Sequence, residues 1–335
     1  MEQLLESLPF LAAPFAACLV IASLHCYMGL HVIQRGVIFV DLALAQTAAL
    51  GAAVALFVMP FVCRHPGPCP AEPSAALDTE AQLAEQLDRQ GDARTESALG
   101  AKDNVGEPHQ HAAHEHEHKG LAYGMSLLFA LAGAVLLSFG RLRDERIPHE
   151  AIIGIIFVVC ASLNVLLLSK APHGHERMEA MLVGSILFVS WQQVAAMLVL
   201  YLILGVFHIG LARQFVEISR NVGAAEKAGK RVRLWDCLFY GSFALMVTQS
   251  VNVAGVLVVF SYLIIPAACA CLLTDRFGSQ LVLAWIVAAV TTVLGLALSA
   301  AGDLPTGASL VSCFGAVLVL FAVVRALLPR RSHLT

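Results

Sequence analysis

Charged residues are scarce in this chain. Of its 335 residues, 13% are Asp, Glu, Lys or Arg, whereas 58% are hydrophobic and the mean hydropathy is +0.76. Soluble domains usually carry about one quarter charged residues. Between the few charges, several apolar stretches reach the roughly 20 residues that an α-helix needs to cross a bilayer. The composition therefore excludes a soluble globular protein and predicts an all-α, polytopic membrane protein.

Motifs of several enzyme classes are also missing. No His-Glu-x-x-His sequence occurs, which argues against an intramembrane metalloprotease. The glycines at 223 and 229 are spaced one residue too widely for a phosphate-binding loop, and Arg231 stands where Ser or Thr is required. We therefore expect no enzymatic activity and no covalently bound cofactor, and any ATP hydrolysis would belong to a separate subunit.

Basic residues are absent before the first apolar stretch, which Glu2 and Glu6 precede. A secretory signal would carry Lys or Arg there, so we expect a retained first span. Seven of the nine cysteines fall in apolar spans or at their ends, where they act as small hydrophobic residues. Only Cys63 and Cys69 lie in a polar segment, and whether these two pair stays open.

Nine apolar segments are long enough to be membrane-spanning helices. They cover residues 9–33, 37–61, 121–140, 150–169, 181–212, 234–250, 253–273, 281–300 and 308–328. The fifth is longer than one crossing requires, so we expect a short re-entrant or interfacial piece over 181–190. An arrangement with eight spans stays open, because the sixth and seventh segments run almost together.

The distribution of Lys and Arg predicts the orientation. The short connections after the first, third, fifth and seventh segments are basic, and residues 213–233 alone hold six Lys and Arg side chains. The short connections on the other face contain only Lys170 and Arg177. Because cytoplasmic connections carry the excess of basic residues, the N-terminus is expected outside and the C-terminus in the cytoplasm.

One long polar loop, residues 62–119, separates the second and third spans on the outer face. It has 11 acidic and five basic side chains and too few large apolar residues to form a core. Its end is rich in His and Glu, the donors that suit zinc, copper or nickel. We expect weak capture of metal by six histidines of this loop: His65, His109, His111, His114, His116 and His118. The domain organisation is thus spans one and two in 1–61, this extracytoplasmic loop, and spans three to nine in 120–335.

Burying an ionisable residue inside an apolar span is unfavourable in free energy, so such residues are candidates for function. Asp41 begins the second span and Glu150 the fourth, where a carboxylate also suits the helix dipole. Gln46 lies five residues after Asp41, about 140° around a helix, so the two would not hold one ion together. We expect Asn164 to form a hydrogen bond between helices. The histidines of the spans, His25 among them, are expected in packing or interfacial positions.

The cytoplasmic stretch 213–233 combines basic residues with a core of small ones. We expect a short helix ended by a glycine that docks on a soluble partner, with contacts from Ala224, Ala225, Glu226 and Gly229. A plain cytoplasmic loop would explain the positive charge but not the small residues.

The order and spacing of several motifs resemble the membrane subunits of zinc- and manganese-type ABC metal importers. They are VIQRGVIFVDLALAQTAALG at 32–51, HEAIIGIIF at 149–157, MLVGSIL at 181–187, VAGVL at 253–257, SYLIIPAACA at 261–270 and DLPTGA at 303–308. Apart from the 62–119 loop, the resemblance extends over nearly the whole chain. It implies an ABC importer permease fold and import of a divalent metal, with zinc as the first expectation.

The same resemblance implies the partners. They are a cytoplasmic ABC ATPase that docks on the coupling segment 213–233, an extracytoplasmic metal-binding protein, a second copy of the chain and the lipid of a bacterial inner membrane. No nucleic acid is expected. Many members of this family carry a histidine where Gln46 stands and a ligand where Leu42 stands. The ion path in this chain would then use Asp41, Glu150 or other groups.

Two other functions are weaker than a metal importer, and one alternative stays open. A metal exporter or secondary carrier usually has a His-rich loop in the cytoplasm and His/Asp pairs four residues apart within its spans, and neither feature occurs here. A sensor that only binds metal through its loop does not explain the full-length motifs. An ABC permease for manganese or iron has the same motifs as one for zinc, so the residues do not separate these substrates.

Overall fold

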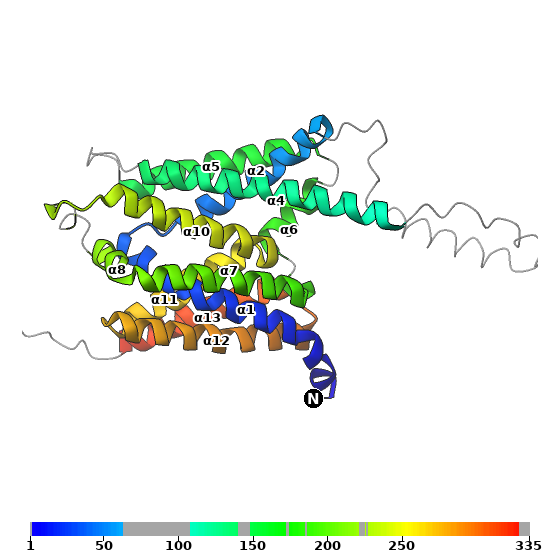
Figure 1. Ribbon diagram of the computed structural model, residues 1–335. Coiled ribbons are helices and arrows are strands. Elements are labelled where there is room, and N and C mark those ends of the chain that lie inside the picture. The colour runs from blue at the N-terminus through cyan, green and yellow to red at the C-terminus, as the bar shows by residue number, and fades with distance from the viewer. Residues whose placement is uncertain are drawn as a thin grey trace, which may run out of the picture. The chain divides into compact units, whose positions relative to one another are not determined.

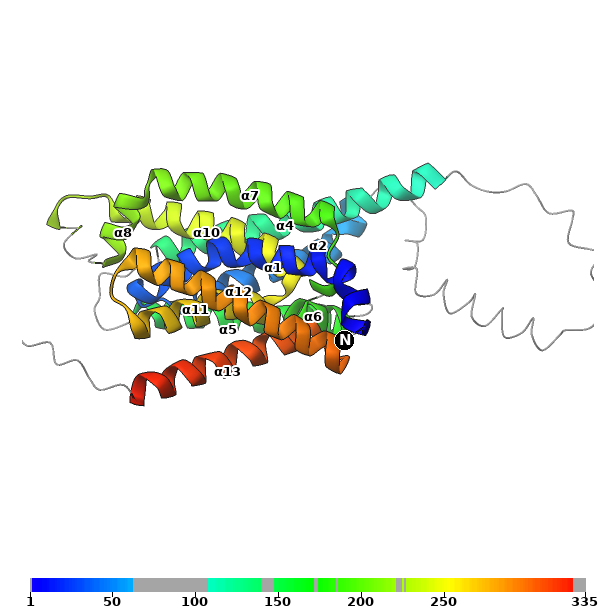
Figure 2. The same ribbon diagram turned by 90° about the horizontal axis from the view of Figure 1, so that it is seen from below.

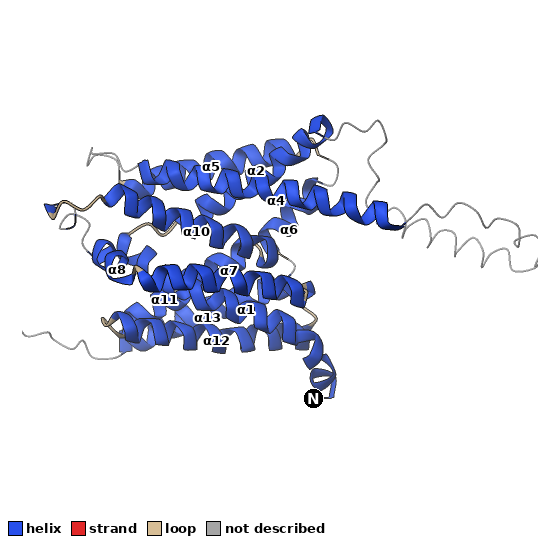
Figure 3. Ribbon diagram, viewed as in Figure 1, coloured by secondary structure: helices blue, strands red, loops and turns tan. Residues whose placement is uncertain are grey.

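The computed structural model describes residues 2–62, 108–139, 148–171, 174–184, 186–220, 225 and 227–327, and every regular element in these ranges is a helix (Figure 3). The elements are α1 (Glu2–Arg35), α2 (Val40–Val62), α4 (Pro108–Phe139), α5 (His149–Leu168), α6 (Gly174–Val183), η1 (Ile186–Phe188), α7 (Trp191–Gly210), α8 (Ala212–Arg220), α10 (Val232–Ala254), α11 (Val256–Leu273), α12 (Phe277–Gly302) and α13 (Thr306–Leu327). The all-α prediction is confirmed, since a helix satisfies its own backbone hydrogen bonds within lipid.

In the described part of the chain, nine helices are long and apolar enough to cross a membrane. These segments are Leu11–Arg35, Val40–Val58, Gly120–Phe139, His149–Leu168, Trp191–Gly210, Val232–Ala254, Val256–Leu273, Phe277–Gly302 and Thr306–Leu327. The prediction of nine spans, rather than eight, is confirmed. The fifth span begins at Trp191, where Ser190 and Gln193 form a capping box, and the short helices α6 and η1 precede it, as expected from its length.

The chain divides into two compact units, which are described separately. One comprises Met1–Leu56 and Ala122–Thr335, and the other comprises Phe57–Leu121. Within the second unit, α4 already begins at Pro108, so the last residues of the expected 62–119 loop have helical backbone. Proline is favoured at the start of a helix because its missing N–H would have no intrahelical partner there.

Helix α1 lies at the centre of the larger unit. It packs against α7, α8, α11 and α12, and α13 covers α11 and α12 at the edge of the bundle (Figures 1 and 2). The close approach of α1 to α11 depends on Gly29, because a Cβ atom at this position would lie 1.9 Å from the carbonyl oxygen of Leu263. Small residues of this kind let helix backbones meet within a membrane.

The turn between α10 and α11 consists of Gly255 alone. Its φ of 78° is in the left-handed region that glycine adopts without strain. A Cβ atom on Gly255 would lie 2.4 Å from the backbone nitrogen of Gly184, which follows α6. The turn and the end of α6 are therefore in backbone contact, and neither glycine has room for a side chain.

Candidate functional site

The second residue of α2, Asp41, carries a carboxylate into the interior of the bundle. Its side chain is 1% exposed, and neither of its oxygens has a hydrogen-bond partner among the described residues. Its position in the first turn suits the helix dipole, as the sequence indicated. A dipole does not replace the hydrogen bonds that a buried carboxylate loses with water, however. Asp41 therefore has the chemistry of a group that binds a cation or a proton.

A second polar group of the core is His25 on α1. Its Nδ1–H donates to the carbonyl oxygen of Ile21 over 3.0 Å, because a carbonyl can only accept. This bond leaves Nε2 as the nitrogen with a free lone pair, and it lies 3.4 Å from the Ser250 hydroxyl. Ser250 already donates to the carbonyl oxygen of Met246 over 2.9 Å. The imidazole is thus held in the tautomer and orientation that metal-binding histidines adopt.

Tyr201 on α7 contacts His25 directly and interacts with Asp41 only through the charge of the carboxylate. Its hydroxyl lies 3.3 Å from Nδ1 of His25 and also interacts with the Ser250 side chain. The Asp41 carboxylate is close enough to act electrostatically on the same hydroxyl. We call His25, Asp41, Tyr201 and Ser250 the His25 cluster. It brings together helices α1, α2, α7 and α10.

The His25 cluster offers an imidazole nitrogen, a carboxylate and two hydroxyls. Such a mixed nitrogen and oxygen set suits divalent transition metals. Among the described residues, no three His, Cys, Asp or Glu side chains come together as in a closed structural metal site. A small number of protein ligands is what a transported ion requires, because it has to leave again.

Gln46 and Glu150 lie outside this cluster. The Gln46 side-chain oxygen accepts a hydrogen bond of 3.0 Å from Nδ2 of Asn164, and the Gln46 backbone carbonyl accepts another of 3.1 Å. The expected bond of Asn164 between helices is therefore confirmed, and it occupies the side-chain oxygen of Gln46. Glu150 is half-buried in the first turn of α5.

The segment after α7 contains the amphipathic helix α8, which lies earlier than the helix we expected. Phe215 and Ile218 are fully buried on one face of α8. Ile218 packs with Ala225 and with Val232 at the start of α10. Ala225 is thus a packing residue, whereas Ala224 and Glu226 lie outside the described residues. Gly229, with a φ of 76°, forms the turn before α10.

An ion pair on the surface links two residues of the same segment. Lys230 Nζ lies 2.7 Å from Oε2 of Glu217, and both side chains are partly exposed. The hydrogen bond and the positive charge of Lys230 hold the pKa of Glu217 below its usual value. Exposed pairs of this kind contribute little to stability. The burial of Phe215 and Ile218 therefore contributes more than this ion pair to holding α8 against the bundle.

The histidines of the loop remain sequence predictions. His65 lies outside the described residues. Residues 109–118 belong to the first turns of α4, but their side chains also lie outside what the structure describes.

A family model described as the ABC 3 transport family matches residues 120–325, more than half of the chain. The chain belongs to the ABC 3 transport family. Its membership confirms the family resemblance that the motifs suggested, and with the nine long apolar helices it makes the chain a multi-pass membrane protein.

Several curated proteins are related to this ABC 3 chain. It is 26% identical over 198 residues to the manganese transport system membrane protein MntB of Synechocystis, which is 57% of this chain and 64% of that protein. With the manganese protein MntC of Listeria monocytogenes it shares 27% over 187 residues, 55% of this chain and 65% of the relative. With the chelated iron transport system membrane protein YfeC of Yersinia pestis it shares 26% over 191 residues, 57% and 63% of the two chains. The chain thus matches slightly less than two thirds of the length of these relatives.

Solved structures show the same fold. PsaBC from Streptococcus pneumoniae, in complex with Fab, superposes with a TM-score of 0.64 at 17% identity, over 95% of this chain and 92% of that chain. A metal-chelate type ABC transporter in an inward-facing conformation gives a TM-score of 0.58 at 14% identity, over 93% of this chain and 85% of that chain. The expected ABC permease fold is therefore confirmed.

Sequence reasoning missed most of the His25 cluster. His25 was expected to be a packing residue, and Tyr201 and Ser250 were not singled out. They lie 176 and 225 residues from His25 in the sequence. No local spacing could have shown that they meet. The only local signal was an ionisable or polar side chain within an apolar span, which Asp41 and His25 share.

Proposed function

We propose that this chain is the membrane-spanning subunit of an ATP-driven importer of a divalent transition metal. Its family, and the manganese and iron transport systems for which its relatives are named, support transport of a metal. ATP hydrolysis would take place in a separate cytoplasmic ATPase, and an extracytoplasmic protein would deliver the metal. The pore would be built from two copies of the chain in a bacterial inner membrane, with the N-terminus outside and the C-terminus in the cytoplasm.

The observation that carries the metal assignment is the buried, unpaired carboxylate of Asp41, whose charge acts on Tyr201 of the His25 cluster. Neither Asp41 oxygen has a partner among the described residues, and the hydrogen bond of His25 to Ile21 leaves Nε2 available. A divalent cation that moves along this path would compensate the charge of the carboxylate and would find a ligand in Nε2 of His25. A neutral cargo would leave the carboxylate charge uncompensated.

Zinc remains the first expectation for the metal, because five histidines occur within residues 109–118 and an imidazole stands in the His25 cluster. The names of the relatives favour manganese or iron instead. Imidazole suits zinc and iron, whereas carboxylate and hydroxyl oxygens suit manganese, so the cluster is compatible with each of them.

Two further segments have a place in this proposal. The His-rich end of the outer loop, with His65, would capture metal near the pore entrance. The segment 213–233, with helix α8, Ala224, Ala225, Glu226 and Gly229, would dock on the ATPase and transmit its movement. Gln46 and Glu150 would line the path of the ion without binding it together with Asp41.

The test is the metal content of cells that lack this chain, compared with complemented cells, under metal limitation. We expect loss of one divalent metal in the deletion strain. Loss of zinc, of manganese or of iron would each support the import mechanism and identify the substrate. Excess metal in the deletion strain would instead reverse the direction and favour an exporter. An unchanged content of every metal would contradict the transport assignment.

Variants of the cluster test the site. Asp41→Asn and His25→Gln should each lower the rate of metal uptake about 10- to 100-fold, the range found when groups around a metal are replaced. Glu179→Gln is the matched control, because Glu179 is an exposed carboxylate on α6 and should leave uptake unchanged. Normal uptake by both cluster variants would place the metal path elsewhere in the bundle.

A further inference from the structure

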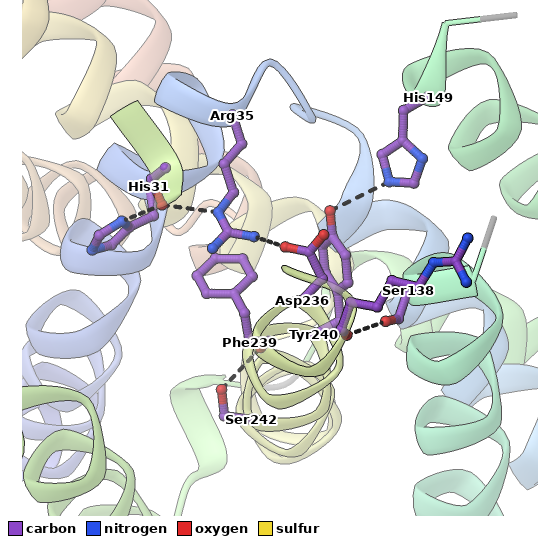
Figure 4. A network of polar contacts seen from close by, with 10 residues as sticks. His31, Arg35, Ser138, His149, Asp236, Phe239, Tyr240 and Ser242 are labelled. Carbon is purple, nitrogen blue, oxygen red and sulfur yellow. Dashed lines mark hydrogen bonds and ion pairs between the residues drawn. The ribbon is translucent and has the colours of Figure 1, made fainter. Parts of the chain in front are cut away.

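The cytoplasmic end of α1 carries a buried ion pair that none of the preceding argument uses. Arg35, the last residue of α1, places Nη1 2.7 Å from Oδ1 of Asp236 on α10, and the two side chains are 2% and 3% exposed. The guanidinium lies over the ring of Phe239, with Cζ 4.0 Å from the ring centroid. Figure 4 shows Arg35 extending from α1 towards Asp236 and Phe239.

The same guanidinium also reaches the cytoplasmic helix α8. Its Nε donates to the Ser219 hydroxyl over 2.9 Å, and His31 Nδ1 lies 2.9 Å from the same hydroxyl. Arg35 therefore connects α1, α8 and α10 through one rigid, planar group. A lysine could pair with Asp236 but could not hold Ser219 in the same fixed geometry.

Further hydrogen bonds connect the start of α10 to other helices. The Tyr240 hydroxyl lies 3.3 Å from Nε2 of His149 on α5, and Ser138 on α4 donates to the carbonyl oxygen of Arg233 over 3.0 Å (Figure 4). Movement of α8 and of the segment that leads into α10 would therefore be passed to several helices at this level of the bundle.

The position of Arg35 in the chain links it to the His25 cluster. His25 lies ten residues earlier on the same uninterrupted helix, about 15 Å along its axis. Asp41 lies six residues later, directly after the turn that connects α1 to α2. A displacement of Arg35 would therefore shift both the imidazole and the carboxylate of the cluster.

We propose that Arg35, held by Ser219 and Asp236, is the link that transmits movement of α8 to the His25 cluster and so couples ATP hydrolysis to metal release. Arg35 is a positioning residue in this scheme, since it does not contact the metal. The inference rests on the proposed function. A contiguous set of contacts makes such a link physically available, and only a measured coupling establishes it.

The test uses the complete transporter, with its ATPase and its metal-delivering protein, in proteoliposomes. Ser219→Ala removes the hydroxyl but keeps the buried ion pair, and Arg35→Lys keeps the charge but loses the fixed geometry. Each should lower the amount of metal transported per ATP hydrolysed about 2- to 30-fold, which corresponds to the coupling energies of such networks. ATP hydrolysis should continue, and Ser219→Thr should restore coupling because it restores the hydroxyl.

Glu179→Gln is the control, because Glu179 is an exposed carboxylate on α6, outside the segment that docks on the ATPase, and should not alter the ratio. An unchanged ratio in both Ser219→Ala and Arg35→Lys would overturn the link. A proportional loss of ATP hydrolysis, uptake and folded protein would also overturn it, because that pattern indicates a purely structural role.

A second measurement does not depend on metal transport. Cys26 is fully buried next to His25 on α1, so its reaction with methyl methanethiosulfonate, read by mass spectrometry, reports movement there. A non-hydrolysable ATP analogue should change this rate in the wild-type complex and in Glu179→Gln, and the change should be lost in Ser219→Ala. If the nucleotide analogue does not change the reaction rate of Cys26 in the wild-type complex, the link is contradicted. If metal transport fails while the reaction rate of Cys26 still responds to nucleotide, only the proposed function is contradicted.

Discussion

The buried carboxylate of Asp41 lowers the stability of the fold and is expected to contribute to function. A carboxylate that is 1% exposed and without a hydrogen-bond partner among the described residues loses its contacts with water and gains none. Asp41→Asn removes the charge at nearly constant volume, so we expect the unfolding temperature in detergent to rise by about 2–4 °C. Metal uptake should fall in the same variant, because stability and activity oppose each other at such sites. A lower unfolding temperature together with normal uptake would show that Asp41 has a structural role.

At the scale of the elements, close packing of α1 against α11 depends on Gly29. Because a Cβ atom there would lie 1.9 Å from the Leu263 carbonyl oxygen, Gly29→Ala has to push the two backbones apart. We expect a loss of about 1–3 kcal/mol in the free energy of unfolding, typical of overpacked cores. This loss is measured by thermal unfolding in detergent, monitored as the fraction of protein that remains monodisperse.

Gly205 on α7 provides the control for this prediction. A Cβ atom on Gly205 would meet nothing within 4 Å, so Gly205→Ala should be neutral or stabilise its helix by up to about 1 kcal/mol. Equal effects of the two substitutions would show that helix propensity, rather than the contact between α1 and α11, controls stability.

At the scale of the whole molecule, an odd number of spans places the two ends of the chain on opposite faces of the membrane. The nine spans and the basic connections predict a cytoplasmic C-terminus. A green fluorescent protein fused after Thr335 should therefore fluoresce. Alkaline phosphatase inserted into the 62–119 loop should be active, because that loop is expected outside. The opposite pair of results would invert the topology.

The His-rich end of the outer loop gives a second prediction at this scale. Replacing the five histidines of residues 109–118 by Asn should raise the metal concentration needed for half-maximal uptake and leave the maximal rate unchanged. The reason is that a weak capture site matters only when metal is limiting. A rate that falls equally at every metal concentration would indicate that the loop has a structural role instead.

Membrane insertion, the apolar segments that become the spans and the family resemblance were all determined by the sequence alone. These properties depend on apolar runs, on Lys and Arg counts and on motifs, and each of these lies within a few tens of consecutive residues. The interhelical bond of Asn164 could be expected for the same reason, since a polar side chain in an apolar span needs a partner.

Only the tertiary structure decided which polar residues meet. His25 contacts Tyr201 and Ser250, and Arg35 contacts Ser219 and Asp236, across 176 to 225 residues of sequence. The sequence of a span shows that its buried polar group needs a hydrogen-bond partner, but the packing between helices determines which residue that partner is. Likewise, the sequence placed Asp41 at a helix start, and only the surrounding helices made its carboxylate buried and unpaired.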